Sequence, residues 1–228
     1  MQRLVYTSCQ LRSRAVLALA AIAVVLAVVG IVSTLLQQAD LPGAPVDGCP
    51  AHPPGEVRQS VIAQAQIVVG LILLAAFLLW IYQAHANLPA LGAKYLKYSP
   101  PWAVGWFFIP IFNLFRPVQV IEEIWKASDP DVIDKDGLAW VGTPMSALVV
   151  VWWILFLVGM VWWRIALHYA AEATTSSALC NADFLSIIDD GLTAGSAAMT
   201  MALVWMTTRR QEEKYARLQE LRSTWSGH

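Results

Sequence analysis

The sequence predicts an all-α membrane protein, a polytopic bundle of four transmembrane helices with an aromatic cytoplasmic segment that is interfacial or re-entrant. Hydrophobic residues make up 57% of the 228 residues and charged residues only 14%, a balance that soluble domains rarely show. Four stretches without charge are long enough to cross a hydrocarbon layer of about 30 Å as helices. Most lysines and arginines fall on one side of these stretches, as expected for a multi-pass membrane protein.

The four predicted spans cover residues 15–36, 61–82, 145–168 and 187–208, within a single membrane domain of residues 1–228. Thr143 and Pro144 open the third span with an N-cap residue and a proline at the first helical position. The apolar stretch of the first span exceeds the roughly 7 to 15 residues usual in a signal peptide, so we interpret it as an uncleaved anchor. Residues 209–228 favour a cytoplasmic helical tail, in which Glu213 can pair with Arg217.

Basic residues predict the orientation in the plasma (inner) membrane. Thirteen of the 15 lysines and arginines lie before the first span, between the second and third, or after the fourth. Only Arg58 and Arg164 lie on the other side. By the positive-inside rule, both termini are expected in the cytoplasm. No single basic patch indicates nucleic acid as a partner.

The loop between the second and third spans is rich in aromatic residues. Residues 102–115 form an apolar run that is too short to span, with basic residues at both ends, so it should re-enter the bilayer or lie on its cytoplasmic surface. The helix expected after Arg116 presents Ile121, Ile124 and Trp125 on one face, and Glu122 and Glu123 on the other. It fits the headgroup plane, but packing on the bundle itself is a competing interpretation. The residues predicted to be interfacial, within a segment of about residues 102–127, are Trp102, Trp106, Phe107, Pro110, Asn113, Arg116 and Trp125.

A set of short motifs in this loop resembles a known family. They are Trp80-x-Tyr82, Asn87-Leu88-x-x-Leu91-Gly92, Ser99-Pro100-x-Trp102-Ala103-Val104-Gly105-Trp106-Phe107-x-x-Pro110, Asn113-Leu114-x-x-Pro117 and Glu123-Ile124-Trp125-x-Ala127-Ser128. Together they are similar to a family of bacterial four-helix membrane proteins known as domain of unknown function 4328. The resemblance covers about residues 80–130, implies the four-helix fold and implies no substrate.

Three pairings or packing surfaces are predicted in the spans and outer loops. Arg164 and either Asp189 or Asp190 should lie at similar depth and form an ion pair, unless each reaches the outer headgroups separately. Cys49 and Cys180 lie in the two predicted outer loops and should form a disulfide, the alternative being two unpaired thiols. Gly191, Gly195 and Ala198 form a small-residue face suited to close helix packing, inside the bundle or in a dimer.

The chemistry of the sequence favours a non-catalytic role. The acidic stretch from Asp129 to Asp136 is spaced like a calcium loop, but Trp140 stands where the twelfth ligand, a glutamate, is required. No catalytic residue, metal site or cofactor is predicted, although an enzyme is the weakest of three classes rather than an excluded one. We expect a membrane scaffold or accessory subunit, in contact with membrane lipid and a protein partner in the membrane. The alternative is a transporter or lipid-handling protein, for which the broken aromatic segment and Arg164 are the best indications.

Overall fold

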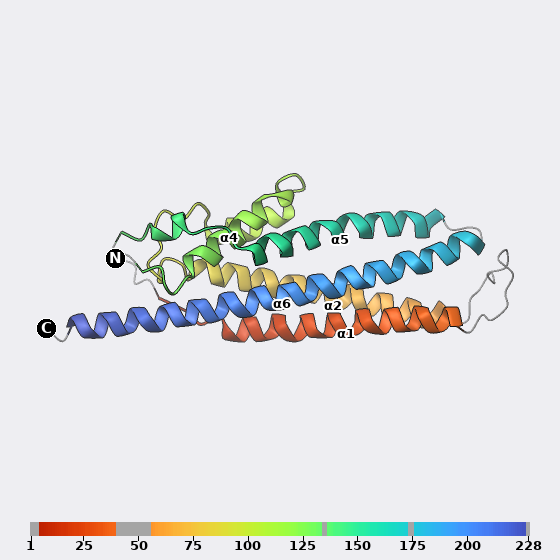
Figure 1. The fold of residues 1–228 in the computed structure, drawn as a ribbon, viewed down its shortest axis with the longest axis horizontal. Helices are drawn as coiled ribbons and strands as arrows, with labels where there is room; N and C mark the ends of the chain where they lie inside the picture. Colours follow the sequence, from red (N-terminus) through yellow and green to blue (C-terminus); the bar gives the residue numbers. More distant parts are fainter. Residues whose placement is uncertain (1–4, 40–55, 134–135, 173–175, 227–228) are drawn as a thin grey trace. The chain divides into compact units, whose positions relative to one another are not determined.

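The protein is described by a computed structural model, which covers residues 5–39, 56–133, 136–172 and 176–226 (Figure 1). These residues form helices and no strand. The long helices are α1 (Gln10–Ala39), α2 (Glu56–Ala86), α5 (Ala147–Glu172) and α6 (Ser176–Ser226). The connection from α2 to α5 carries the short helices α3 (Pro100–Gly105), η1 (Trp106–Phe108), η2 (Phe112–Leu114), α4 (Arg116–Ala127) and η3 (Ala139–Gly142).

Four helices of the described chain are long and apolar enough to cross a membrane. Their apolar spans are Gln10–Gln37, Val57–Ala86, Ala147–Tyr169 and Phe184–Thr224. The predicted number and order of spans are therefore confirmed. The helices extend beyond the predicted spans at every end but one, because the flanking polar residues continue them. The exception is the start of α5, where the predicted opening at Thr143 and Pro144 is wrong because the helix begins only at Ala147. Helix α6 runs for 51 residues and includes residues 209–226 of the predicted tail.

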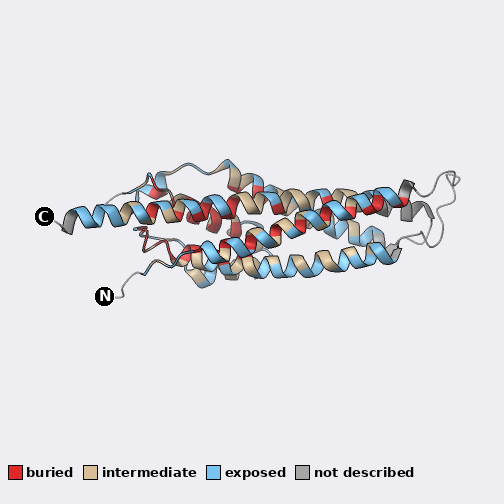
Figure 2. Cartoon of the chain, turned by 90° about the horizontal axis from the view of Figure 1, so that it is seen from below, coloured by how far each residue is buried: buried red, intermediate tan, exposed pale blue. Residues whose placement is uncertain are grey.

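The exposed surface of the long helices is strongly apolar. On α2, large side chains such as Ile67, Val68 and Leu71 are exposed, whereas the buried face of α1 consists largely of small residues such as Ala20 and Ala27. Figure 2 shows buried positions in red recurring along the long helices beside exposed positions in pale blue. A bundle whose helices expose large apolar side chains and pack against one another through small ones is suited to a lipid environment.

The chain divides into two compact units, and each long helix contributes a segment to both. Unit 1 comprises Met1–Ala18, Leu74–Trp153 and Met201–His228, and unit 2 comprises Leu19–Leu73 and Ile154–Thr200. Unit 1 contains the loop and its short helices.

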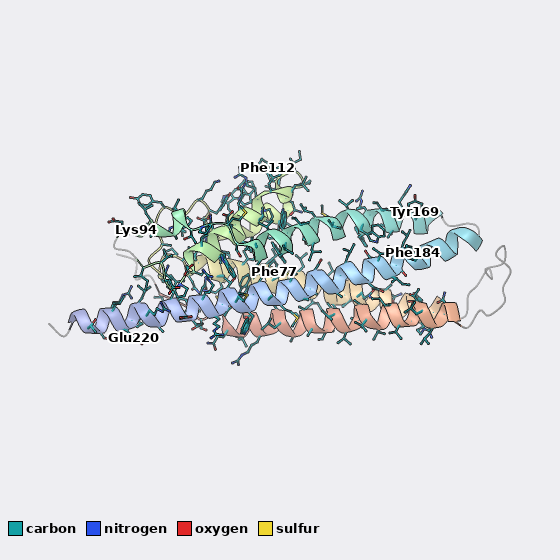
Figure 3. All side chains as sticks on the ribbon, viewed as in Figure 1. Phe77, Lys94, Phe112, Tyr169, Phe184 and Glu220 are labelled. Carbon is teal, nitrogen blue, oxygen red and sulfur yellow. The ribbon has the colours of Figure 1, made fainter. Side chains whose placement is uncertain are left out.

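An aromatic cluster around Phe77 organises unit 1. Phe77 is labelled on the ribbon in Figure 3. Its ring stacks on Trp80 at 5.7 Å between centroids, meets Phe107 edge-on at 6.4 Å and lies 5.7 Å from Trp152. The contacts join α2, η1 and α5, so the aromatic loop is packed against the ends of two long helices rather than suspended beside them.

Backbone contacts around two glycines join the first and last parts of the connection between α2 and α5. The Lys94 amide donates to the Gly137 carbonyl at 3.0 Å, and the Trp140 indole N–H lies 3.1 Å from that oxygen. Gly92 and Gly137 both have a positive φ, 86° and 71°. A Cβ on Gly137 would lie 2.5 Å from the Gly92 carbonyl oxygen, so the two segments of the loop approach each other at a distance that only glycine allows.

Candidate functional site

The most extensive polar site of unit 1 is centred on Asn87, which is fully buried just after α2. Its side-chain N–H group donates to the Thr7 carbonyl at 2.8 Å and lies 3.3 Å from the Cys9 sulfur and 3.4 Å from Gln211 Oε1. Its Oδ1 accepts from the Thr7 amide at 3.2 Å and from Gln83 Nε2 at 3.1 Å. Both ends of the amide are thus bonded, and they fix the N-terminal segment to α2 and α6.

Gln211 extends this network from α6 to α4. Its Nε2 donates to the Ala84 carbonyl at 2.9 Å and to Ser128 Oγ at 3.0 Å. One turn further along α6, the buried Lys214 ammonium donates to the Ala127 carbonyl at 2.9 Å. These bonds satisfy carbonyls at the ends of α2 and α4, where a helix leaves them unpaired. We call the four buried side chains Cys9, Asn87, Ser128 and Gln211 the polar clamp.

Cys9 in the polar clamp is a free, buried thiol. Its burial raises the pKa of the thiol to about 12, although the positive charge of Arg12 opposes the shift. Because the thiolate is the reactive form, Cys9 is a structural thiol rather than a nucleophile near neutral pH.

A buried histidine and glutamate lie beside the clamp. His85 Nε2 is 3.8 Å from Glu123 Oε2, and Glu123 Oε1 accepts from the Lys97 amide at 2.6 Å. The expectation that Glu123 belongs to a polar outer face of its helix is wrong, because its carboxylate turns inward to bond the loop backbone. Among the described residues, no group of three or more histidine, cysteine, aspartate or glutamate side chains is placed to hold a metal ion.

The acidic stretch after α4 is bonded by arginines of α6. Arg210 pairs with Asp129 at 2.6 Å, and Arg217 pairs with Asp131 at 2.8 Å. Arg217 also pairs with Glu213 at 2.6 Å, which confirms the predicted pair. Two carboxylates of the calcium-like pattern therefore bind guanidinium groups; Asp134 lies outside the described residues.

The aromatic loop presents a second, exposed site, centred on Arg116 at the start of α4. Its guanidinium lies 5.4 Å from the Trp106 ring and 5.8 Å from the Phe112 ring. It also donates to Tyr98 Oη and Gln119 Oε1, both at 3.2 Å. Around it stand large apolar side chains that are at least 39% exposed, which we call the aromatic platform: Trp102, Phe108, Ile111, Phe112, Leu114 and Phe115.

Most residues predicted to be interfacial belong to this surface or border it. Trp102 and Pro110 are exposed, and Trp106, Phe107, Asn113 and Arg116 are half-buried. Trp125 differs, because it is only 8% exposed and the Arg210 guanidinium covers its ring at 4.4 Å. For α4 the structure thus matches the competing interpretation, in which the helix packs on the bundle.

In unit 2, the buried Asp190 carboxylate accepts from Gln66 Nε2 at 2.7 Å. It also lies directly against Gly30 of α1, where a Cβ would overlap it. Arg164 is exposed on α5, and within the described part of the chain it forms no salt bridge with Asp189 or Asp190. The structure therefore brings Asp190 to an amide partner that the sequence analysis did not identify, and the ion pair stays a prediction.

The small-residue face of α6 and the disulfide are the other two predicted features. A Cβ on Gly191 or Gly195 would meet nothing within 4 Å, and Ala198 is exposed, so this small-residue face is uncovered in unit 2. The predicted disulfide falls on Cys49 and on the side chain of Cys180, which lie outside the described residues.

Sequence reasoning missed Gln211 and Cys9 as members of the polar clamp. Both lie among polar residues, where the spacing of apolar residues does not indicate which side chains are buried. Only Asn87 and Ser128 belong to the motifs that carry the resemblance. The partners of those two motif residues could be found only once the fold had joined the N-terminal segment, α2, α4 and α6.

Comparison with known proteins gives one match. No curated protein and no solved structure matches the chain. Residues 55–209 match the family described as "Domain of unknown function (DUF4328)". The match includes Asn87, Ser128 and the aromatic platform, whereas Cys9 and Gln211 lie outside it. Since it covers more than half of the 228 residues, the chain belongs to the DUF4328 family.

Proposed function

We propose that this protein is a non-catalytic membrane scaffold or accessory subunit that presents the aromatic platform to a partner protein in the membrane. The observation that carries the proposal is the polar clamp. Its two buried amides bond each other and the backbone of the N-terminal segment and α2, and Gln211 also bonds the Ser128 hydroxyl at the end of α4. The start of the loop and the end of α4 are therefore both held by the clamp. An exposed aromatic surface carried by a loop that is held in this way is the arrangement expected of a binding face.

The proposed orientation places both termini and the aromatic platform on the cytoplasmic side of the plasma membrane. It rests on the thirteen basic residues that flank the spans on that side. A single cysteine placed at the exposed Ile111, in a background without native cysteines, should resist a membrane-impermeant maleimide in intact cells and react after permeabilisation. Labelling in intact cells would contradict this orientation.

Site-specific crosslinking tests the scaffold proposal. A photoreactive phenylalanine analogue at Phe108 or Ile111, both exposed on the platform, should give a discrete adduct with one protein in cells. The matched control is the same analogue at Val25, which is exposed on α1. The adduct should also weaken in an Asn87→Leu variant, because the platform then loses its support. Crosslinks to lipid alone from the platform positions would contradict a scaffold role.

A lipid-handling protein is the second candidate, and Arg116 favours it. A guanidinium set among exposed aromatic rings can attract a lipid phosphate while the rings enter the headgroup layer. Lipid adducts at Phe108 that diminish in an Arg116→Gln variant, without any protein adduct, would support this candidate instead of the scaffold.

We also propose that Cys49 and Cys180 form a disulfide in the outer loops, on the side where disulfides persist. Non-reducing and reducing electrophoresis of proteolysed protein should show the two loops joined only without reductant. If both thiols are alkylated in intact, non-reduced cells, the bridge does not exist.

A further inference from the structure

Unit 1 contains a groove between the start of α1 and the second half of α6, separate from the aromatic platform. The two segments lie side by side in Figure 1, and the free volume of the groove is about 350 Å³. Among its lining residues, Arg14 and Arg209 supply positive charge, Glu212 supplies negative charge, and Leu17 and Trp205 supply apolar surface. The groove is therefore amphipathic.

The charges of this groove favour an anion. Arg14 and Arg209 are both exposed, and neither forms a salt bridge with a residue in the described part of the chain. The Glu212 carboxylate accepts from Ser8 Oγ at 2.6 Å. Two guanidinium groups and one carboxylate leave one net positive charge, which matches one phosphodiester.

The apolar part of the groove favours a lipid over a free phosphate. Leu17 and Trp205 lie within apolar spans, and the Trp205 ring is 52% exposed beside Arg209, whose guanidinium is 5.7 Å from its centroid. Tryptophan beside arginine is typical of the level where headgroups meet acyl chains. A soluble phosphate could satisfy the arginines but would leave this apolar surface uncovered.

We propose that this groove binds an anionic phospholipid, with its phosphodiester between Arg14 and Arg209 and an acyl chain along Leu17 and Trp205. Basic pockets beside membrane-spanning helices bind anionic headgroups by the same combination of charge and apolar contact. The site is independent of the proposed partner face, because it uses different helices and different residues.

Native mass spectrometry of the full chain tests the site. The protein is released into mild detergent from vesicles of equal parts phosphatidylglycerol and phosphatidylethanolamine. Wild-type protein should retain phosphatidylglycerol selectively. Arg14→Gln or Arg209→Gln should each reduce this selectivity about fivefold, and the double variant about 30-fold, given a contribution of about 1 kcal/mol for each basic residue near a membrane surface.

Arg222→Gln is the matched control, since Arg222 is exposed on the same helix and its loss removes the same charge. It should leave the selectivity unchanged. Equal loss in Arg222→Gln, or unchanged selectivity in the double variant, would overturn the proposal. If the double variant fails to fold in a thermal unfolding assay, Arg14→Gln alone decides, because this exposed side chain supports no described salt bridge.

Discussion

The polar clamp of unit 1 and the Asp190 contact of unit 2 are two buried polar sites built in opposite ways. In the clamp, neutral amides, a hydroxyl and a thiol bond one another and several backbone groups. The Asp190 carboxylate instead accepts one hydrogen bond, from Gln66 Nε2 at 2.7 Å, and lies directly against Gly30. The clamp joins four segments through several hydrogen bonds, whereas the Asp190 contact rests on one hydrogen bond and on the absence of a side chain at Gly30.

Removing the centre of the clamp should have the largest effect on stability. Asn87→Leu leaves the Thr7 backbone groups and Gln211 Oε1 without their partner in a buried site, which should lower the free energy of unfolding by about 3 kcal/mol. Thermal unfolding in detergent, followed by tryptophan fluorescence, measures the loss. The control Gln219→Leu changes an exposed amide and should have little effect; equal stability of both variants would refute the clamp.

Filling the space opposite Asp190 should have the next largest effect. In Gly30→Ala the new methyl group would overlap the Asp190 carboxylate, so this side chain must leave its position beside Gln66, at a cost of about 2 kcal/mol. Gly70→Ala is a matched control on α2, because a Cβ there meets nothing within 4 Å. Comparable melting temperatures for the two variants would show that α1 does not pack on Asp190 in this way.

Double-mutant cycles identify the partner of Asp190. The Gln66→Ala and Asp190→Ala pair should show a coupling of about 1.5 kcal/mol, because a hydrogen bond to a charged group is lost. The pairs of Arg164→Ala with Asp190→Ala and with Asp189→Ala test the predicted ion pair under the same conditions. Additive effects in both arginine cycles would exclude that ion pair, and additive effects in the Gln66 cycle would exclude the amide contact.

The smallest expected effect concerns Cys9 and pH. Because the pKa of the thiol is raised from 9.0 to about 12 on folding, the folded state keeps the proton that the unfolded state releases. This contribution to stability is present below pH 9 and decreases as pH rises from about 9 to about 12. In a Cys49→Ser, Cys180→Ser background, alkylation of Cys9 at pH 9 should be far slower in folded than in unfolded protein. Equal rates would show that the thiol is not buried.

The sequence was sufficient for the spans because each depends on a local property, a long run of residues without charge. For the aromatic loop, Trp102 and Pro110 are exposed in the structure, and their position at the membrane surface stays a prediction. The sequence failed for Trp125 and Glu123, because periodicity divides a helix into faces but does not say which neighbour covers each face. Arg210 covers the first and the Lys97 backbone bonds the second, and both come from distant parts of the chain.

The close approach of Gly92 and Gly137 limits the substitutions that the gene can tolerate at these two codons. Every single-nucleotide missense change in a glycine codon introduces a side chain with a Cβ. At Gly137 this atom would collide with the Gly92 carbonyl, and at Gly92 the positive φ of 86° disfavours any such residue. Missense changes at both codons should therefore be eliminated by selection, whereas alanine should recur at Gly142, where a Cβ meets nothing within 4 Å.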